Sequence, residues 1–518
     1  MFVIFDTETT GLPKDWNAPI TDSDNWPRMV QLAWQIHDNL GKFVEAKNYI
    51  IKPEGYEIPF QAEKVHGIST EKAIKLGHDL QEVLQIFNEN VQNCEYLVGH
   101  NVSFDIAIVN AELYRKSISS PLDSKIAIDT KDESTDFCAL PGGRGGKFKW
   151  PKLGELHYKL FNENFDEAHN ASADVMATAR CFLELVRIQV ISAAILKKTE
   201  DFILDFKKAN PKSIAPAKID IVSNFTNDSK PETISVTKEP IKEFTGDKAF
   251  VHLHVHSQYS ILDGAASISG LVKKAKADGM TALALTDHGN MFGIKDFHVT
   301  CKKEGIKPIL GCEAYLVNDI NPELKDKTNN HVILLAKNIA EYKNLLKLIS
   351  IANLQGMYYK PRIDKINLEK YKEGLIVSSA CLGGEISRTL MEEGIEASEK
   401  VIMWYKQTFG DDFYLELMRH PCEDERQKRE ITENQNYVNA ELIKFANKHA
   451  IKLIATNDVH FINKQDATAH DLLICLNTNS DVNDPKRMRY TRQEWFKTTE
   501  EMFDLWAESD EKKVLEKN

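Results

Sequence analysis

The fold of the first part of the chain is decided by residues 2–11, which read Phe2-Val3-Ile4-Phe5-Asp6-Thr7-Glu8-Thr9-Thr10-Gly11. Four consecutive apolar residues predict a buried strand. The two carboxylates that follow, Asp6 and Glu8, are two positions apart, so in a strand they point to the same face. Two such charges repel each other unless a cation lies between them. The pair therefore indicates a divalent metal site that favours Mg²⁺ or Mn²⁺, and two solvated acids after an edge strand are the alternative.

Further acids lie at the starts of two predicted helices. Residues 96–99 predict a short strand, which leads into His100-Asn101-Val102-Ser103-Phe104-Asp105 and a helix to Tyr114. The stretch His169-Asn170-Ala171-Ser172-Ala173-Asp174 begins a helix that we expect to continue to about Lys198. Strands predicted at 30–37 and 47–51, and helices at 70–90 and 152–161, complete a mixed α/β module.

Three motifs in this module occur in a specific order over about residues 1–190. Asp-x-Glu-Thr-Thr-Gly, His-Asn-x-x-Phe-Asp and His-x-x-x-x-Asp resemble the three motifs of the proofreading 3′→5′ exonucleases, a group that includes the epsilon subunit of bacterial DNA polymerase III. Each motif is weak alone, but the three together are specific. The resemblance implies a ribonuclease H-like DEDDh exonuclease domain over residues 1–195. Its implied catalytic residues are Asp6, Glu8, Asp105, His169 and Asp174.

The chemistry of phosphodiester hydrolysis explains these residue types. Four carboxylates can hold two metal ions ~4 Å apart, which polarise the phosphate, activate a water and stabilise the leaving 3′ oxygen. His169 is suited to be the general base for that water, and an exposed loop histidine is the alternative. The resemblance also implies that the single-stranded 3′ end of a DNA primer is held by Thr9, Gly11, Leu12 and His66. Phe104 either packs on the terminal nucleotide or fills the core.

The composition of the 518 residues fits a globular protein of about two to four domains. No apolar run approaches the ~20 residues of a membrane helix, and no signal peptide is recognisable, so we expect a cytoplasmic protein without a membrane partner. Eight scattered cysteines without a C-x-x-C pair indicate reduced thiols. The net charge of −12 argues against non-specific coating of nucleic acid, but not against a nuclease that meets phosphate through metal ions.

A change in composition separates this module from the next. From about Pro211 to Asp247, Pro, Ser, Thr, Asn and Lys dominate, and Pro216, Pro231 and Pro240 break any apolar periodicity. Such a segment cannot bury enough apolar surface to fold alone. We predict a flexible linker over residues 196–247.

Three histidines at alternate positions, His252, His254 and His256, begin the second module on one face of a predicted strand. Six more strands are predicted near 282–285, 308–312, 332–336, 374–377, 413–417 and 452–455. Amphipathic helices are predicted between them, for example at 269–277, 340–351, 397–406 and 430–449. Seven strands with intervening helices predict a barrel of the (β/α) class over 248–465.

Polar residues of metal-binding types lie at or near the ends of these strands, where parallel barrels form their active sites. They are Asp263, Asp287-His288, Glu313, His331, Cys381, Asp458 and His460. Taken singly, His331 or Cys381 is more often a satisfied core residue than a ligand. A set spread over successive strands indicates a multinuclear centre, and mixed imidazole and carboxylate ligation suits Zn²⁺ or Mn²⁺.

The sequence of this module, over about residues 248–500, resembles the polymerase-and-histidinol-phosphatase (PHP) domain at the N-terminal end of bacterial DNA polymerase III alpha subunits. The matching stretches include His-Leu-His-Val-His-Ser-x-Tyr-Ser-x-x-Asp-Gly, Thr-Asp-His-Gly, Gly-Cys-Glu-Ala-Tyr, Tyr-Tyr-Lys-Pro-Arg, Ala-Cys-Leu-Gly-Gly-Glu and Ala-Thr-Asn-Asp-Val-His. The resemblance implies a distorted (β/α)7 barrel with up to three Zn²⁺ or Mn²⁺ ions. The implied ligands, none of them substituted, are His254, His256, Asp263, His288, Glu313, His331, Cys381, Asp458 and His460.

Residues 466–518 fit the connection that leads into the polymerase palm in that family, and no later stretch offers the paired aspartates of a palm. We therefore expect the N-terminal part of a replicative polymerase with a fused proofreading exonuclease; a natural short protein or a split subunit is the alternative. Expected partners are DNA, a sliding clamp and a clamp loader. Two other functions stay open: the barrel as the main phosphatase, pyrophosphatase or nuclease, and a non-catalytic replisome scaffold.

Overall fold

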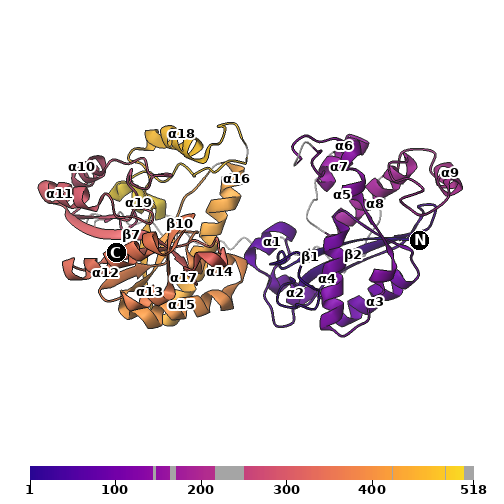
Figure 1. The fold of residues 1–518 in the computed structure, drawn as a ribbon, viewed down its shortest axis with the longest axis horizontal. Helices are drawn as coiled ribbons and strands as arrows, with labels where there is room; N and C mark the ends of the chain where they lie inside the picture. Colours follow the sequence, from indigo (N-terminus) through magenta and orange to yellow (C-terminus); the bar gives the residue numbers. More distant parts are fainter. Residues whose placement is uncertain (144–146, 164–170, 216–249, 423, 485, 507–518) are drawn as a thin grey trace, which may run out of the picture. The chain divides into compact units, whose positions relative to one another are not determined.

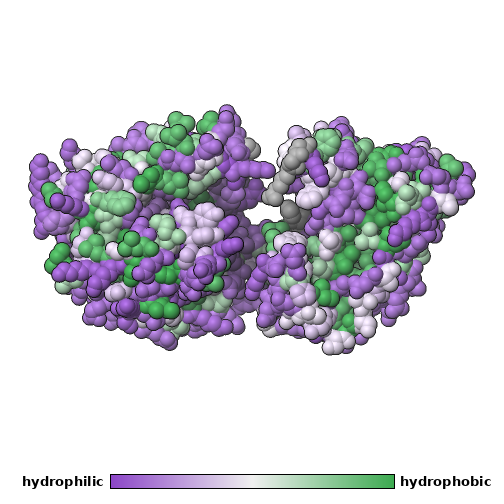
Figure 2. All heavy atoms as spheres, in the orientation of Figure 1, coloured by the Kyte–Doolittle hydropathy of each residue, from purple (hydrophilic) through white to green (hydrophobic). Residues whose placement is uncertain are grey.

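The computed structural model describes residues 1–143, 147–163, 171–215, 250–422, 424–484 and 486–506. The chain forms two compact units, Met1–Thr237 and Lys238–Asn518. Within the described ranges, no helix is long and apolar enough to span a membrane. Figure 2 shows a mostly hydrophilic surface on the visible face of each unit, with apolar residues in scattered patches.

The first unit is built on a five-stranded mixed sheet with the order β3-β2-β1-β4-β5. Strands β1 (Phe2–Thr9), β2 (Met29–His37) and β3 (Phe43–Ile50) are antiparallel neighbours. Strands β4 (Tyr96–Gly99) and β5 (Ile126–Asp129) run parallel to β1. The α/β class predicted for this module is confirmed.

Helices cover both faces of this sheet (Figure 1). The helices α8 (Ala171–Arg187) and α9 (Glu200–Ala209) share one apolar core with Phe2 and Ile4 of β1. On the other face, β1 contributes Val3 and Phe5 to a core with α3 (Leu80–Gln92) and α4 (Val102–Arg115). Because strand side chains alternate, Asp6 and Glu8 continue the row of Phe2 and Ile4 and lie on the face that α8 covers.

Three boundaries in this unit differ from the sequence prediction. The helix expected at 70–90 is two helices, α2 (Thr70–Leu76) and α3, because the chain turns at Gly77 and pairs at His78. The helix expected to reach Lys198 ends at Arg187. The linker predicted from residue 196 begins too early, because α9 buries Ile203 and Phe206 in the core of the first unit. The remaining helices are α1 (Phe60–His66), α5 (Thr130–Glu133), α6 (Thr135–Cys138) and α7 (Leu153–Phe161).

The second unit is built on an eight-stranded sheet in the order β13-β12-β11-β8-β7-β10-β9, with β6 also paired to β7. Its strands are β6 (Ala282–Leu285), β7 (Lys307–Val317), β8 (Asn330–Ala336), β9 (Met357–Tyr358), β10 (Lys360–Asp364), β11 (Leu375–Ser378), β12 (Phe413–Met418) and β13 (Lys452–Thr456). The sequence prediction missed β9 and β10, because Pro361 interrupts the run and leaves only a short strand beside the far half of β7.

The histidine-rich segment at 250–257 is not a regular strand, contrary to the prediction, but it bridges β6 and the segment after β13. On one side, Ala284 N donates to His252 O at 3.0 Å. On the other side, His256 N donates to Val459 O at 2.7 Å and Val459 N to His254 O at 3.2 Å. These bonds join the two ends of the sheet into an irregular ring. The side chains of this segment therefore alternate as in a strand, although its backbone makes only a few of the hydrogen bonds of a regular strand.

Strand β8 runs against its neighbours. It pairs antiparallel with both β7 and β11, whereas β6 and β10 run parallel to β7, and β12 runs parallel to β11 and β13. The short strand β9 is antiparallel to β10. The start of β8 therefore lies at the same end of the sheet as the carboxyl ends of the parallel strands. This reversal explains why His331 stands at the beginning of its strand while His288, Cys381 and Asp458 follow the ends of β6, β11 and β13. Glu313 was predicted near a strand end but lies within β7, which continues to Val317.

Helices surround these strands (Figure 1). They are α10 (Ile268–Ala277), α11 (Ile294–Glu304), α12 (Ile339–Leu354), α13 (Lys365–Lys370), α14 (Glu385–Glu392), α15 (Ile395–Phe409), α16 (Glu425–Gln427), α17 (Glu433–His449), α18 (Ala467–Thr478) and α19 (Thr499–Trp506). Part of the segment predicted to begin a connection at residue 466 packs on the barrel. His470 of α18 bonds the backbone oxygen of Asp263 at 2.7 Å, and Phe496 and Trp506 are fully buried.

Two candidate metal centres

The acids predicted in the first unit converge at the end of β1. Carboxylate oxygens of Asp6, Glu8 and Asp174 lie within 4.8 Å of one another. Asp174 reaches the strand from the first turn of α8, which crosses this face of the sheet. A single cation could therefore contact all three side chains. The spacing of Asp6 and Glu8 predicted the pair, and the family resemblance implied Asp174.

Asp105 joins this group from the opposite face of the sheet. It is buried in the first turn of α4, and its Oδ1 accepts hydrogen bonds from Thr7 N at 2.9 Å and Thr7 Oγ1 at 2.7 Å. Thr7 lies between Asp6 and Glu8, so these bonds fix Asp105 beside both acids. The hydroxyl of Thr7 is thus a second point of attachment that the motif alone did not reveal.

Electrostatics in this cluster oppose ionisation. Burial, together with the charges of Asp105 and Asp174, raises the pKa of Asp6 well above its usual value. The same burial and charges raise the pKa of Glu8 to about 8. Burial also raises the pKa of Asp105 to about 7, although its bonds from Thr7 act in the opposite direction. Uncompensated negative charge of this kind is what divalent cations neutralise, and an all-oxygen ligand set fits Mg²⁺ or Mn²⁺.

The predicted substrate residues lie around the end of β1. Thr9 Oγ1 donates to Gly11 O at 2.6 Å, and the side chain of Leu12 is 71% exposed just beyond that turn. His66 is buried, and its Nδ1 accepts from Ile68 N at 3.1 Å. Burial lowers the pKa of His66 to about 4, partly offset by its contact with the backbone of Thr9. His169, the predicted general base, lies outside the described residues.

The sequence reasoning missed Trp16 as part of this site. Its ring, 54% exposed, lies with its centroid 5.8 Å from that of the half-buried Phe104, in the turn of α4 that carries Asp105. The loop that presents Trp16 is held in place, because Asp15 N donates to Asn25 Oδ1 at 2.7 Å and Asn25 Nδ2 donates back to Asp15 O at 2.9 Å. The available signal was a tryptophan in an otherwise polar insertion directly after the first motif.

The nine residues predicted in the second unit converge at the mouth of the barrel. Glu313 is central: its carboxylate lies 2.6 Å from His288 Nδ1, 2.8 Å from His331 Nδ1 and 3.2 Å from His256 Nε2. Asp458 Oδ1 lies 3.1 Å from His254 Nε2 and 3.2 Å from His256 Nε2.

The three remaining members complete the ring. Asp263 lies 3.5 Å from His288 Nε2 and 3.9 Å from His460 Nε2, and Cys381 Sγ lies 3.7 Å from His331 Nδ1. Three overlapping triads have ligand atoms within 4.8 Å of one another: His256, His288 and His460; His254, His256 and Asp458; His288, Glu313 and His331. Overlapping triads fit a multinuclear centre rather than a single ion.

Buried polar atoms at this mouth point at one another without hydrogen-bond partners. Such atoms are His254 Nε2, His256 Nε2, His288 Nδ1, Asp263 Oδ1, Glu313 Oε2 and Asp458 Oδ1. A buried polar group without a partner costs free energy, so a convergent set of them needs protons or cations at its centre. The residues therefore fit bound metal ions, and the mixture of imidazole and carboxylate suits Zn²⁺ or Mn²⁺.

Charges in this second cluster compensate each other. Burial alone would lower the pKa of His288, but the carboxylates of Glu313 and Asp263 outweigh it and raise this pKa to about 10. Burial would likewise raise the pKa of Glu313, yet the imidazoles of His331 and His288 hold it well below its usual value. Without cations, His254 and His288 thus form buried ion pairs with the carboxylates, whereas burial and the neighbouring His256 lower the pKa of His460 to about 4.

A second layer of side chains orients the imidazoles. His254 Nδ1 lies 2.7 Å from Glu416 Oε1, and Ser378 Oγ donates to Glu416 Oε2 at 2.6 Å. His256 Nδ1 lies 2.8 Å from Ser260 Oγ. With Nδ1 engaged, the Nε2 atoms of both histidines face the centre of the cluster. Glu416 was not predicted; its signal was one acid in the otherwise apolar strand Phe413–Met418.

A cavity of about 410 Å³ lies at the edge of this cluster. The metal-ligand candidate His288 lines it together with Tyr315, Phe292 and Lys360. The His288 and Tyr315 rings are stacked with centroids 5.9 Å apart, and Lys360 Nζ lies 5.3 Å from the Tyr315 centroid. The cavity gives a small ligand a route to the imidazole of His288.

Comparison with known proteins agrees with this division into two units. Residues 3–182 match the family model described as Exonuclease, and residues 252–420 match the model of the PHP domain. Both families depend on metal ions. The chain is 47% identical over 267 residues to DNA polymerase III subunit alpha of Borreliella burgdorferi, which covers 51% of this chain and 22% of that protein.

The corresponding subunit of Campylobacter jejuni is 43% identical over 276 residues, again 51% of this chain and 22% of that protein. The chain thus spans about a fifth of the length of these relatives. A solved structure of exonuclease I aligns with 39% of this chain and 45% of its own, at 20% identity and a TM-score of 0.32, which is too low to bear on function. The family matches establish that this chain joins an exonuclease domain to a PHP domain.

Proposed function

We propose that the first unit is a 3′→5′ DNA exonuclease that removes mismatched nucleotides from the single-stranded 3′ end of a primer during replication. The observation that carries this proposal is the convergence of Asp6, Glu8 and Asp174 within 4.8 Å, with Asp105 fixed beside them through Thr7. The match of residues 3–182 to the exonuclease family and the similarity to polymerase III alpha subunits support it.

In this proposal the chain's own residues divide the work. Asp6, Glu8, Asp105 and Asp174 hold Mg²⁺ or Mn²⁺, which when bound polarises the scissile phosphate and increases the acidity of water. His169 takes the proton from the attacking water. Leu12, Phe104 and Trp16 contact the terminal nucleotide, and the turn at Thr9 and Gly11, supported by His66, positions the backbone of that nucleotide.

The barrel is proposed to hold up to three Zn²⁺ or Mn²⁺ ions on its nine converging residues and to act as a phosphoesterase centre. The complete ligand set, the unpartnered buried atoms at its centre and the cavity at His288 favour this second activity over a purely structural role. Proposed partners of the chain are the DNA primer end and the sliding clamp and clamp loader of a polymerase III holoenzyme. The similarity to alpha subunits supports this assembly.

Paired substitutions separate the two activities. Asp6→Ala with Glu8→Ala should lower Mg²⁺-dependent release of dNMP from a single-stranded oligonucleotide by more than about 100-fold, since even the outer partners of a metal ligand contribute 10- to 100-fold. His254→Ala is the matched control in the barrel and should leave this digestion unchanged. Digestion that survives the double substitution and is lost in His254→Ala would assign the nuclease to the barrel instead.

A further inference from the structure

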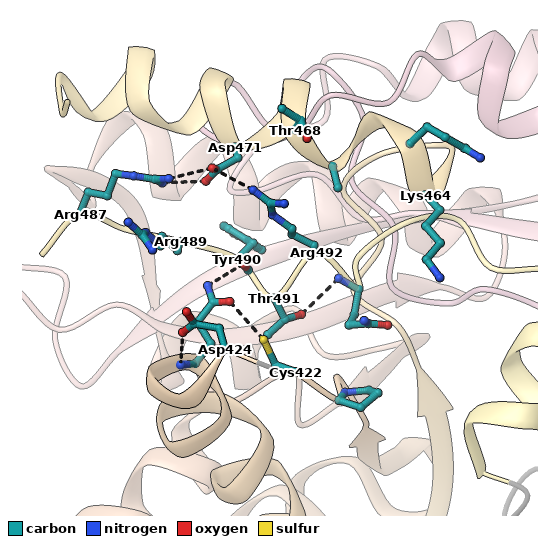
Figure 3. Close-up of a pocket in the computed structure, with 15 residues that line it drawn as sticks. Cys422, Asp424, Lys464, Thr468, Asp471, Arg487, Arg489, Tyr490, Thr491 and Arg492 are labelled. Atoms are coloured by element: carbon teal, nitrogen blue, oxygen red, sulfur yellow. Dashed lines mark hydrogen bonds and ion pairs between the residues drawn. The ribbon is translucent and has the colours of Figure 1, made fainter. Parts of the chain in front are cut away.

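A second cavity of the barrel unit, of about 840 Å³, lies next to the metal centre and has no part in the function described so far. The stretch 487–493 forms much of its wall, and α18 and the segment around Asp424 form the rest. Figure 3 shows Arg487, Arg489 and Arg492 around this cavity, with Lys464 on another side. A cavity of this size holds a ligand larger than a single phosphate ion.

Tyr490 connects the cavity to the metal centre. Tyr490 lines the cavity, and its backbone oxygen accepts a hydrogen bond from Gln427 Nε2 at 2.7 Å. Its hydroxyl donates to Asp263 Oδ2 at 3.0 Å and lies 3.3 Å from His460 Nε2. One residue thus contacts two proposed metal ligands and forms part of the cavity wall, so a ligand here would lie within one side chain of the centre.

The charges of the lining leave a positive surplus. Arg487 is neutralised by Asp471, because its Nη1 and Nη2 lie 2.6 and 2.7 Å from the two carboxylate oxygens. The other acid, Asp424, accepts from Gln427 N at 3.0 Å and caps the start of α16. Asp471 also pairs with Arg492, whose Nη2 lies 3.6 Å from Asp471 Oδ2. Four basic side chains of the lining, Lys464, Arg487, Arg489 and Arg492, thus face only two acids, Asp424 and Asp471.

The side chain of Arg489 is the strongest single piece of evidence for a ligand in this cavity. Its Nε is buried and has no hydrogen-bond partner, and no ion pair to its guanidinium exists in the part of the chain that the structure describes. A buried donor without a partner is costly, so this guanidinium is placed for an acceptor supplied from outside. Guanidinium groups match the geometry of phosphate oxygens and bind them in pairs of hydrogen bonds.

The backbone between these arginines is held in a fixed turn. Thr491 N donates to Glu494 Oε1 at 3.1 Å, and Thr491 Oγ1 donates to the same oxygen at 2.5 Å. Arg492 then adopts a left-handed conformation with φ of 66°, which a non-glycine residue rarely adopts without support from its surroundings. The turn directs two nearby side chains to different targets: the hydroxyl of Tyr490 reaches Asp263, and Arg492 lines the cavity.

We propose that this cavity binds the phosphate groups of a nucleotide or of a nucleic-acid strand end, next to the barrel's metal centre. Arg489 and Arg492 supply the charge, and Tyr490 positions the bound phosphate relative to Asp263. The assignment deepens the proposed phosphoesterase role of the barrel, but binding itself needs only the basic residues. It is independent of the exonuclease cluster in the first unit.

The test measures binding by isothermal titration calorimetry on the full chain carrying Asp6→Ala, which prevents digestion, without added divalent ions. The ligands are inorganic pyrophosphate, a deoxynucleoside triphosphate, and an oligonucleotide with or without a 5′ phosphate. Arg489→Gln with Arg492→Gln should weaken binding of at least one phosphate ligand by about 10-fold or more, because each charge-assisted hydrogen bond contributes about 1.5–3 kcal/mol. Arg426→Gln, an exposed arginine of α16 outside the cavity lining, should leave affinity unchanged.

The ligand that loses the most affinity identifies the source of the phosphate. Weakening of the triphosphate alone assigns a nucleotide site, and weakening that needs the 5′ phosphate on the oligonucleotide assigns a strand end. Equal affinities in the double variant and the Arg426→Gln control, or no binding of any ligand, would overturn the proposal. Loss of exonuclease activity with Asp6→Ala is a separate outcome, so a failure of one proposal is distinguishable from a failure of the other.

Discussion

The two clusters collect cations by opposite electrostatic means. The first contains carboxylates only: burial raises the pKa of Asp105 to about 7, and burial together with the charges of Asp174 and Asp105 raises the pKa of Glu8 to about 8. The second alternates imidazoles with carboxylates, so Glu313 is held ionised while the pKa of His288 rises to about 10. One cluster is short of positive charge, whereas the other already contains it as protons.

This difference predicts which ions each cluster takes and what the ions contribute. An excess of carboxylate oxygens attracts hard divalent ions, which come and go with substrate. A buried ring of imidazoles and acids binds transition ions more tightly, and these ions contribute to the stability of the fold. Metal removal should therefore abolish the activity of the first unit without unfolding it, and it should lower the stability of the second unit.

The largest expected effect is the loss of stability when the centre of the imidazole ring is removed. Glu313→Ala leaves several buried imidazoles without their shared acid, and breaking a buried charged group of this kind costs about 3–5 kcal/mol. Hydrogen exchange read by mass spectrometry should show faster exchange in barrel peptides and unchanged exchange in peptides of the first unit.

The matched control for Glu313→Ala is Glu392→Ala, at the exposed end of α14. Surface changes of this type stay within about 0.5 kcal/mol, so its exchange should equal that of the unchanged protein. Similar exchange in both variants would mean that the imidazole ring is not a stabilising centre, and the contrast between the two clusters would fail.

A smaller effect is expected from the layer that orients the ligands. Glu416→Gln keeps the shape of the side chain but weakens the acceptor for His254 Nδ1 at 2.7 Å. Changes of such outer partners typically lower metal affinity by about 10- to 100-fold. Zn²⁺ affinity, measured by competition with a chromogenic chelator, should fall by that factor while Mg²⁺-dependent digestion stays constant. Unchanged Zn²⁺ affinity would remove Glu416 from the centre.

How far the sequence predicts each cluster follows from how local its signals are. Asp6 and Glu8 sit two residues apart on one strand, and the pairing of their carboxylates follows from strand geometry alone. The prediction that Asp105 and Asp174 join this pair rested on the family motifs. The local sequence does not indicate that α4 and α8 approach β1 from opposite faces. The bond from Thr7 to Asp105 was not predictable, since it depends on which face each helix covers.

In the barrel, too, features that depend on contacts between distant parts of the sequence could not be predicted. Nine residues were predicted to meet, and the structure brings them together at one mouth. The reversed direction of β8 was not predicted, because an apolar run of residues carries no information on its direction in a sheet. The irregular pairing of 250–257 was also missed, since period-2 alternation is the same in a regular strand and in an extended segment with bonds on alternate sides.

The pH dependence of metal binding should also differ between the clusters, because metal ions must displace protons from the acids of the first cluster. Folded-state pKa values of about 7 for Asp105 and about 8 for Glu8 lie above those of free acids, so these groups hold protons near neutrality and lose them as the pH rises. The Mg²⁺ concentration needed for half-maximal digestion should therefore decrease as the pH rises from 6.5 to 8.5. The decrease should be up to about tenfold per pH unit for one displaced proton. A constant Mg²⁺ requirement over this range would show that the acids are already ionised.

The smallest effect concerns what lies beside the acids rather than the acids themselves. Trp16 offers an exposed ring 5.8 Å from Phe104, and stacking of a base on an aromatic side chain contributes about 1–3 kcal/mol. Because Trp16 is 54% exposed, we expect the lower end of this range, so Trp16→Ala should raise KM for single-stranded DNA about fivefold with little change in kcat. Phe43→Ala is the control, since Phe43 pairs with His37 and so lies at the opposite end of the sheet from Glu8. A fall in kcat without a change in KM would mean that Trp16 supports the acid cluster instead of the DNA.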